Sequence, residues 1–306
     1  MTGVSHQFRN WGLACFVNFL WAAQYPAYKV ASDAMGIGAL NVWTFIIAVL
    51  VLLPVLIRER RYSKRGASGR KPWSSIVVLA TFGIIPPSIV LSWGIGRSTA
   101  SNAAILSLAI PVMMALMGIV MLKERPQRFF IVSLALALVG TTLISWDDIV
   151  SGSFAGNMLL GNAAIFIGGA GSAFYNAYGK RLLEVFSEIE VLVYSYVVGI
   201  LICMVVSIIA DPVPFYVVTQ WPLRAWLGVL VLGSMTWGLA MALWFWLMKR
   251  LELSQLAIMV YLLPALGVAL SAVTLGERIH LMQWVGAFVV FGSAYVSSAQ
   301  GNDTQS

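Results

Sequence analysis

The chain has 306 residues, of which 60% are hydrophobic and only 10% are charged. Soluble globular domains carry about 25% charged residues, so this composition excludes an ordinary water-soluble enzyme and indicates a surface that faces lipid. The net charge is +7, which in a soluble protein would suggest nucleic acid as a partner. The positions of the basic residues, given below, explain this charge by membrane topology, so no nucleic-acid partner is expected.

Ten apolar runs along the chain are each long enough to cross a bilayer as a helix. Continuous apolar runs of this length are not barrel strands, and only helices or closed barrels satisfy their backbone hydrogen bonds in lipid. The sequence therefore predicts an all-α membrane protein with ten transmembrane helices. The predicted spans are 11–32, 40–57, 75–96, 98–122, 127–146, 158–180, 189–210, 224–248, 253–275 and 280–299.

Lysine and arginine are concentrated on one side of this arrangement. The largest cluster lies between the second and third spans and comprises Arg58, Arg60, Arg61, Lys64, Arg65, Arg70 and Lys71. If that loop is cytoplasmic, 15 of the 19 basic residues are cytoplasmic, and the exceptions are Lys29, Arg97, Arg224 and Arg278. We therefore expect a multi-pass protein of a bacterial-type inner membrane, with both termini in the cytoplasm and the basic loop in contact with anionic lipid.

The chain resembles itself at an offset of 153 residues. The matched pairs are Trp93 and Trp246, Arg97 and Arg250, Ser101 and Ser254, Pro111 and Pro264, and Glu124-Arg125 and Glu277-Arg278. This repeat predicts two five-helix units, 1–150 and 151–306. Because five is odd, the second unit must cross the membrane in the inverted sense. Inverted repeats can expose a central site to each side in turn, so they favour a carrier, although some channels share them.

Two motifs carry a family resemblance. The first helix contains Asn18, Trp21, Pro26 and Lys29, and two later helices each carry a proline followed thirteen positions on by Glu-Arg. In these features the chain resembles the drug/metabolite transporter superfamily, specifically the EamA-type ten-helix transporters, over residues 8–299. The resemblance implies a basket of helices around a central cavity. It also implies the movement of small metabolites, often amino acids and commonly outward.

Polar and aromatic residues follow one face of the first predicted helix. Asn18, Trp21, Tyr25 and Lys29 are spaced by 3, 4 and 4 residues, which places them on one side of a continuous helix. Such a stripe turns toward protein or water, because lipid cannot satisfy it. We interpret it as a cavity wall in which Lys29 could bind a substrate carboxylate. The alternative is helix–helix hydrogen bonding, with Lys29 extended to the outer interface.

The second unit supplies counterparts to this face. Asn176 and Lys180 correspond by the repeat to the region of Tyr25 and Lys29. Aromatic residues within spans could form a wall for a planar or cationic substrate, although packing explains them equally well. The predicted substrate-binding residues are Asn18, Trp21, Tyr25, Lys29, Trp93, Asn176, Lys180, Trp237 and Tyr261.

Paired prolines and glutamates are candidates for hinge and gate residues. Pro111 and Pro264 are each expected in mid-helix, where proline removes a backbone donor, so paired kinks could act as hinges or be static. Glu124 and Glu277 are each followed by arginine at a predicted helix end. Salt bridges or gate contacts explain these glutamates better than catalysis.

Several chemistries are absent from the sequence. It has no GxxxxGK[ST] loop for ATP, no HExxH motif and no Cys/His cluster for a metal. We therefore expect no catalytic residues, no metal and no cofactor, and we do not expect the protein to be an enzyme. The expected function is alternating-access transport of a small polar metabolite, an amino acid or related compound, with export as the expected direction. Open alternatives are a drug-like or nucleotide-sugar-like substrate, a channel, or an intramembrane lipid-modifying enzyme. The sequence does not define an oligomeric state.

Overall fold

All regular elements in the described part of the chain are helices. The computed structural model describes residues 2–62, 72–95, 109–125, 129–144, 146, 159–263, 266 and 281–299. Four helical segments there are long and apolar enough to cross a membrane: Ile37–Arg61, Trp73–Gly94, Glu188–Ala210 and Leu223–Met248. Shorter apolar helices lie at Ala109–Leu122, Phe130–Gly140 and Trp284–Ser293. The predicted all-helical membrane class is confirmed, whereas the full set of ten spans stays a prediction.

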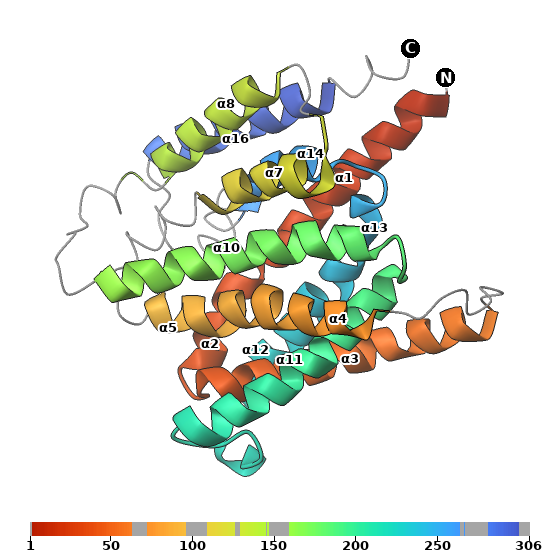
Figure 1. Cartoon of the computed structure of the whole chain (residues 1–306). Helices are drawn as coiled ribbons and strands as arrows, with labels where there is room; N and C mark the ends of the chain where they lie inside the picture. The colour runs from red at the N-terminus through yellow and green to blue at the C-terminus, as the bar shows by residue number, and fades with distance from the viewer. Residues whose placement is uncertain are drawn as a thin grey trace.

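The helices follow the predicted spans closely where the chain is described (Figure 1). The predicted first unit, 1–150, contains α1 (Thr2–Ala22), α2 (Gln24–Ser32), α3 (Ile37–Tyr62), α4 (Trp73–Leu79), η1 (Ala80–Ile84), η2 (Pro86–Val90), α5 (Leu91–Ile95), α7 (Ala109–Leu122) and α8 (Phe130–Ile144). The second contains α10 (Leu159–Leu182), α11 (Glu188–Ala210), η4 (Val218–Gln220), α12 (Leu223–Val231), η5 (Leu232–Ala240), α13 (Met241–Met248), α14 (Leu253–Val260) and α16 (Leu281–Ala299).

The first predicted span is divided into two helices, α1 and α2, by a turn at Ala23. The prediction of one continuous helix over 11–32 is therefore wrong. Pro26 explains the break, because a proline nitrogen has no proton to donate to the carbonyl four residues earlier. As a result, Asn18 and Trp21 lie on α1, whereas Tyr25 and Lys29 lie on α2. The four residues do not share the face of a single helix.

Wider π-helical turns interrupt two of the predicted spans, 75–96 and 224–248. In the first unit, η1 and η2 separate α4 from α5, and in the second unit η5 separates α12 from α13. The offset of 153 found in the sequence moves 80–84 onto 233–237, which lies inside η5. π-helical turns are rare and occur frequently at functional sites. The irregularity therefore recurs at the offset of the sequence repeat.

Helices of the first unit pack mainly against helices of the second. α3 lies along α11, α7 along α14, and α8 along α16, as Figure 1 shows. α10 packs against the α4–α5 segment, and α1 and α2 pack against the α12–α13 segment. In the described part of the chain, the two predicted units therefore pack mainly against each other.

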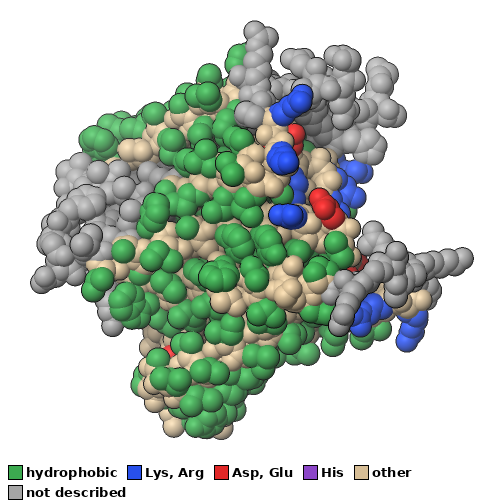
Figure 2. Space-filling view, in the orientation of Figure 1, with side chains coloured by type: hydrophobic (Ala, Val, Ile, Leu, Met, Phe, Trp, Pro, Cys, Tyr) green, Lys and Arg blue, Asp and Glu red, His purple; other side chains and the backbone are tan. Residues whose placement is uncertain are grey.

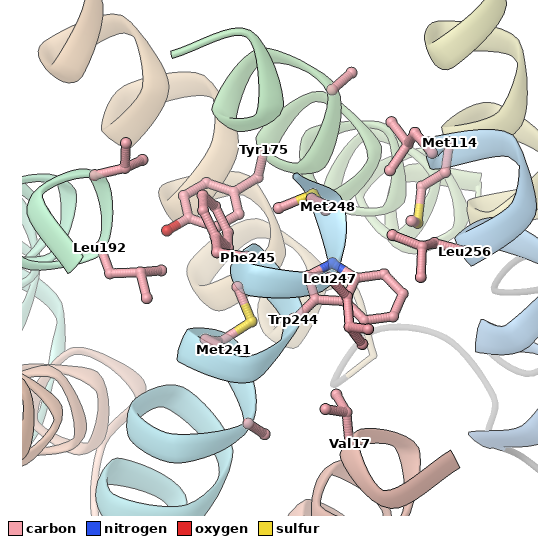
Figure 3. Packing of buried hydrophobic residues seen from close by; sticks show 14 of the residues in the cluster. Val17, Met114, Tyr175, Leu192, Met241, Trp244, Phe245, Leu247, Met248 and Leu256 are labelled. Carbon is pink, nitrogen blue, oxygen red and sulfur yellow. The ribbon is translucent and has the colours of Figure 1, made fainter. Parts of the chain in front are cut away.

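The buried core surrounds α13. Figure 3 shows Trp244 of α13 among Val17 of α1, Met114 of α7 and Leu256 of α14, all within one continuous hydrophobic cluster. In the described part of the bundle, the middle is filled by packed side chains. The central cavity predicted from the sequence therefore stays a proposal.

Charged side chains gather at one end of the bundle (Figure 2). Arg60 and Arg61 lie in the last turn of α3, and Lys180 and Arg181 in the last turn of α10. α11 begins at this same end, at a capping box in which the Ser187 hydroxyl accepts a hydrogen bond from the Glu190 amide. Ser187 also donates its hydroxyl to Glu59 Oε2 of α3 at 2.7 Å. We call this end of the molecule the basic end.

Candidate functional site

Trp21, Asn176 and Trp244 form a buried cluster that joins three helices. Trp244 Nε1 of α13 donates a hydrogen bond to Asn176 Oδ1 of α10 at 2.6 Å. Asn176 Nδ2 in turn donates to the Ser172 carbonyl at 2.8 Å. The ring of Trp21, from α1, lies against the ring of Trp244 with centroids 4.8 Å apart. Two of the predicted site residues, Trp21 and Asn176, are thus brought together through Trp244; we call these three residues the Trp244 cluster.

Asn18 lies one helical turn before Trp21 and is fully buried. Its Nδ2 donates to the Ala14 carbonyl at 2.8 Å. Its Oδ1 has no hydrogen-bond donor among the described residues. Leaving a buried acceptor unpaired costs about 1–3 kcal/mol. Asn18 Oδ1 is therefore a buried acceptor that is free to receive a hydrogen bond, next to the Trp244 cluster.

Glu124 and Lys180 meet at the basic end. Lys180 Nζ of α10 lies 2.7 Å from Glu124 Oε1, which follows α7. The same carboxylate accepts hydrogen bonds from the first amides of α14, with Leu253 N at 2.7 Å and Ser254 N at 3.0 Å. A carboxylate at a helix N-terminus is stabilised by free amides and by the helix dipole. We call Glu124, Lys180 and these two amides the Glu124 junction.

The backbone conformation after α7 positions this carboxylate. Lys123 has a φ of 55°, the only positive value among the described non-glycine residues. This left-handed turn lets the Glu124 amide donate to the Gly118 carbonyl at 3.3 Å. A Cβ atom on Gly118 would lie 2.8 Å from Glu124 Oε2. The glycine and the strained lysine together make room for the carboxylate, and strain of this kind persists only where the surrounding structure holds it.

Further polar groups lie around the junction. Lys180 Nζ donates a further hydrogen bond to the Leu251 carbonyl at 2.6 Å. The side chain of Glu124 is 7% exposed and that of Lys180 is 19% exposed. Burial and the nearby charge of Glu124 raise the pKa of Glu252, whereas Lys180 opposes the rise. A positive charge at Lys180 therefore compensates two carboxylates.

Two of the remaining predicted aromatic residues belong to the same hydrophobic cluster as Trp244, because Tyr261 is one of its buried members and Trp237 packs against it. Trp237 packs edge-on against Phe45, with centroids 5.0 Å apart, and its carbonyl accepts the Tyr196 hydroxyl at 2.9 Å. Tyr261 is buried at the end of α14. Trp93 is 39% exposed.

Some predicted residues lie beyond what the structure describes. Pro264 and Glu277 lie outside the described residues, as do the side chains of Tyr25 and Lys29. Pro111 is described, and it is buried near the start of α7. Within the described residues, no group of three or more His, Cys, Asp or Glu side chains could hold a metal ion.

Sequence reasoning did not identify Gly118, Lys123 or the α14 amides as partners of Glu124. A single sequence marks a glutamate near a helix end, but it does not show which amide groups that carboxylate reaches. Those amides belong to residues about 130 positions later in the chain. The left-handed conformation of Lys123 is likewise invisible, because lysine does not favour positive φ.

An interleaved bundle of apolar helices with a buried polar cluster defines a polytopic membrane protein. Residues 11–146 and 159–299 each match the EamA-like transporter family. The chain belongs to this family, whose members are transporters rather than enzymes.

Curated relatives and a solved structure agree with this family. An "Uncharacterized transporter" of Archaeoglobus fulgidus is 22% identical over 94% of this chain and 96% of its own. A "Probable terminal-alkyne amino-acid exporter" of Streptantibioticus cattleyicolor is 25% identical over 87% of this chain and 85% of its own. A crystal structure with 20% identity superposes with a TM-score of 0.80 over 95% of this chain and 98% of that one. At this identity the superposition shows the fold alone.

Proposed function

We propose that the protein is a secondary transporter that exports a small polar metabolite, an amino acid or a related compound, by alternating access. Membership of a transporter family across the whole chain supports the transport class. The name of the Streptantibioticus cattleyicolor relative, "Probable terminal-alkyne amino-acid exporter", supports the substrate class and direction.

The observation that carries this proposal is the interleaving of the two units. Helices at equivalent positions of the repeat pack against each other, namely α3 with α11 and α8 with α16, and α7 packs against α14 from the paired spans 98–122 and 253–275. The π-helical turns at η1 and η5 recur at the same offset. Two inverted five-helix units, 1–150 and 151–306, would produce this pattern around a pseudo-twofold axis in the membrane plane. Inverted units of this kind exchange conformations, which opens a central site to either side.

The lysine and arginine residues at the basic end support placing that end in the cytoplasm. Lys and Arg accumulate on the cytoplasmic side of inner-membrane proteins, and the last turns of α3 and α10 each end in a basic pair. We therefore propose an inner-membrane protein with the basic end and both termini in the cytoplasm.

The proposed substrate site lies at Asn18 and the Trp244 cluster. The free carbonyl of Asn18 suits an ammonium donor, and the tryptophan faces attract a cation. Lys29 would supply the positive charge for a carboxylate. A zwitterionic amino acid presents both groups. Tyr25, Trp93, Trp237 and Tyr261 complete the proposed wall, with Pro111 and Pro264 as hinges.

Counterflow in proteoliposomes tests this function. Purified protein is reconstituted with a high internal concentration of each unlabelled amino acid in turn, and the entry of labelled amino acid is followed. A carrier shows saturable uptake that overshoots equilibrium. Trp21→Ala should abolish the overshoot, whereas Trp73→Ala, which alters an exposed tryptophan of α4, should leave it unchanged. Unsaturable flux at channel rates would overturn the carrier proposal.

A further inference from the structure

The Glu124 junction connects the two units of the repeat through a single carboxylate. Glu124 follows α7 and belongs to the first unit. Its partners, Lys180 Nζ, Leu253 N and Ser254 N, all belong to the second. If the basic end is to open between the units, all three contacts must break together.

Other polar contacts also cross between the units at the basic end, but neither the hydrogen bond from Ser187 to Glu59 nor the contacts of Arg60 form a buried ion pair. Arg60 contacts Tyr194 and lies 4.0 Å from Glu190, with a side chain that is 60% exposed. Exposed ion pairs contribute little to stability. The carboxylate of Glu124 is 7% exposed, so its partners are protected from water and from competing ions. Removing one partner of such a buried pair is costly, because the other charge stays unpaired.

We propose that the Glu124 junction is the cytoplasmic gate of the transporter, closed in this structure and broken in each transport cycle. This inference rests on the proposed function, since it assumes that the basic end opens. Lys180, with its ammonium held by Glu124 and by the Leu251 carbonyl, acts as a positioning residue of this gate. When the gate opens, Lys180 keeps the Leu251 carbonyl, and the capping box of Glu252 and Gln255 continues to cap α14.

Gating requires a carboxylate that can leave and return without unfolding its helix. The left-handed turn at Lys123 places Glu124 beyond the end of α7, so its side chain can move while α7 stays intact. The space over Gly118 accepts the carboxylate on its return.

Cysteine accessibility tests the gate directly. In a Cys15→Ser, Cys203→Ala background, Ala257→Cys reports on the buried face of α14 one turn beyond the junction, and Ala225→Cys reports on the far end, in α12. Both alanines are fully buried. A membrane-impermeant maleimide is applied from the basic end to one set of oriented vesicles and from the far end to another.

Glu124→Gln should raise labelling at position 257 from the basic end about tenfold, which corresponds to the loss of one hydrogen bond to a charged group. Labelling at position 225 from the far end should stay the same or fall. Lys180→Met should also raise labelling at position 257 from the basic end. The double variant Glu124→Gln, Lys180→Met should be labelled little more than either single variant. The matched control is Lys249→Met. Lys249 forms a 2.6 Å ion pair with Glu188 at the same end, but both residues belong to the second unit.

The outcomes separate the gate from the transport proposal. Increased labelling at both reporters would mean general destabilisation and would overturn the gate. Unchanged labelling in Glu124→Gln, with wild-type counterflow intact, would also overturn it. If the selective increase is seen but no substrate gives counterflow, the gate stands as a conformational device and the proposed transport function fails.

Discussion

Lys180 Nζ lies 2.7 Å from Glu124 Oε1, although 56 residues separate the two in the chain. Lys180 comes from the last turn of α10, and Glu124 comes from the segment after α7. The pair therefore connects the first unit of the protein to the second at the basic end.

The space over Gly118 should be essential to this pair. Gly118→Ala would place a methyl group 2.8 Å from Glu124 Oε2 and should displace the carboxylate, so accessibility at position 257 should rise as in Glu124→Gln. Alanine otherwise favours a helix over glycine by about 1 kcal/mol. Gly12→Ala, where the new methyl meets nothing within 4 Å, should therefore be neutral or stabilising. Equal effects of the two variants on accessibility would contradict this prediction.

The hydrogen bond between Trp244 and Asn176 should contribute measurably to stability. Asn176→Leu removes the acceptor and leaves a buried indole N–H unpaired, at a cost of about 1–3 kcal/mol. Trp244→Phe instead removes the indole N–H that donates this hydrogen bond. Unfolding of the purified protein in detergent is followed by tryptophan fluorescence for both single variants and the double variant. A double variant that loses as much as the two single losses added together would show that the residues do not interact.

Glu252 should make stability depend on pH. Its pKa is raised in the folded protein, first by burial and then by the charge of Glu124. The folded state therefore holds this proton more tightly than the unfolded state. Ionisation costs stability as the pH rises through the ordinary glutamate value, about 4.3. Glu252→Gln keeps an oxygen for the α14 capping box, so it should raise the melting temperature at pH 7 and leave it unchanged at pH 4. The same gain at both pH values would rule out this cause.

Lys29 should be needed for a substrate that carries a carboxylate. Lys29→Ala should slow uptake of such a substrate in proteoliposomes without lowering the amount of protein in the membrane. Arg181→Ala alters an exposed basic residue next to Lys180 on α10 and serves as the control. Unchanged uptake kinetics in Lys29→Ala would remove Lys29 from the site.

The orientation of the chain can be checked at the end of α3. Arg61 is exposed in the last turn of that helix. In the cysteine-free background, Arg61→Cys should react with an impermeant maleimide only when the reagent reaches the cytoplasmic face. Reaction in right-side-out vesicles would reverse the proposed topology.

The sequence alone determined the class of protein, the position of most helices and the basic end, because hydropathy and charge act locally along the chain. It also marked Asn18, Trp21, Asn176, Glu124 and Lys180 as unusual, since polar groups in apolar runs need partners. The break at Ala23 was missed, although Pro26 was visible, because many membrane helices contain proline without breaking.

Only the tertiary structure decided which partners these residues have. Asn176 binds Trp244 across 68 residues, and Glu124 reaches Ser254 across 130. Such pairings depend on how helices far apart in the chain pack side by side, which no local pattern records. Lys180 was predicted from the repeat to face a substrate, and the structure places it against a carboxylate of the other unit. Its charge could be read from the sequence, whereas its partner depended on the packing of α7, α10 and α14.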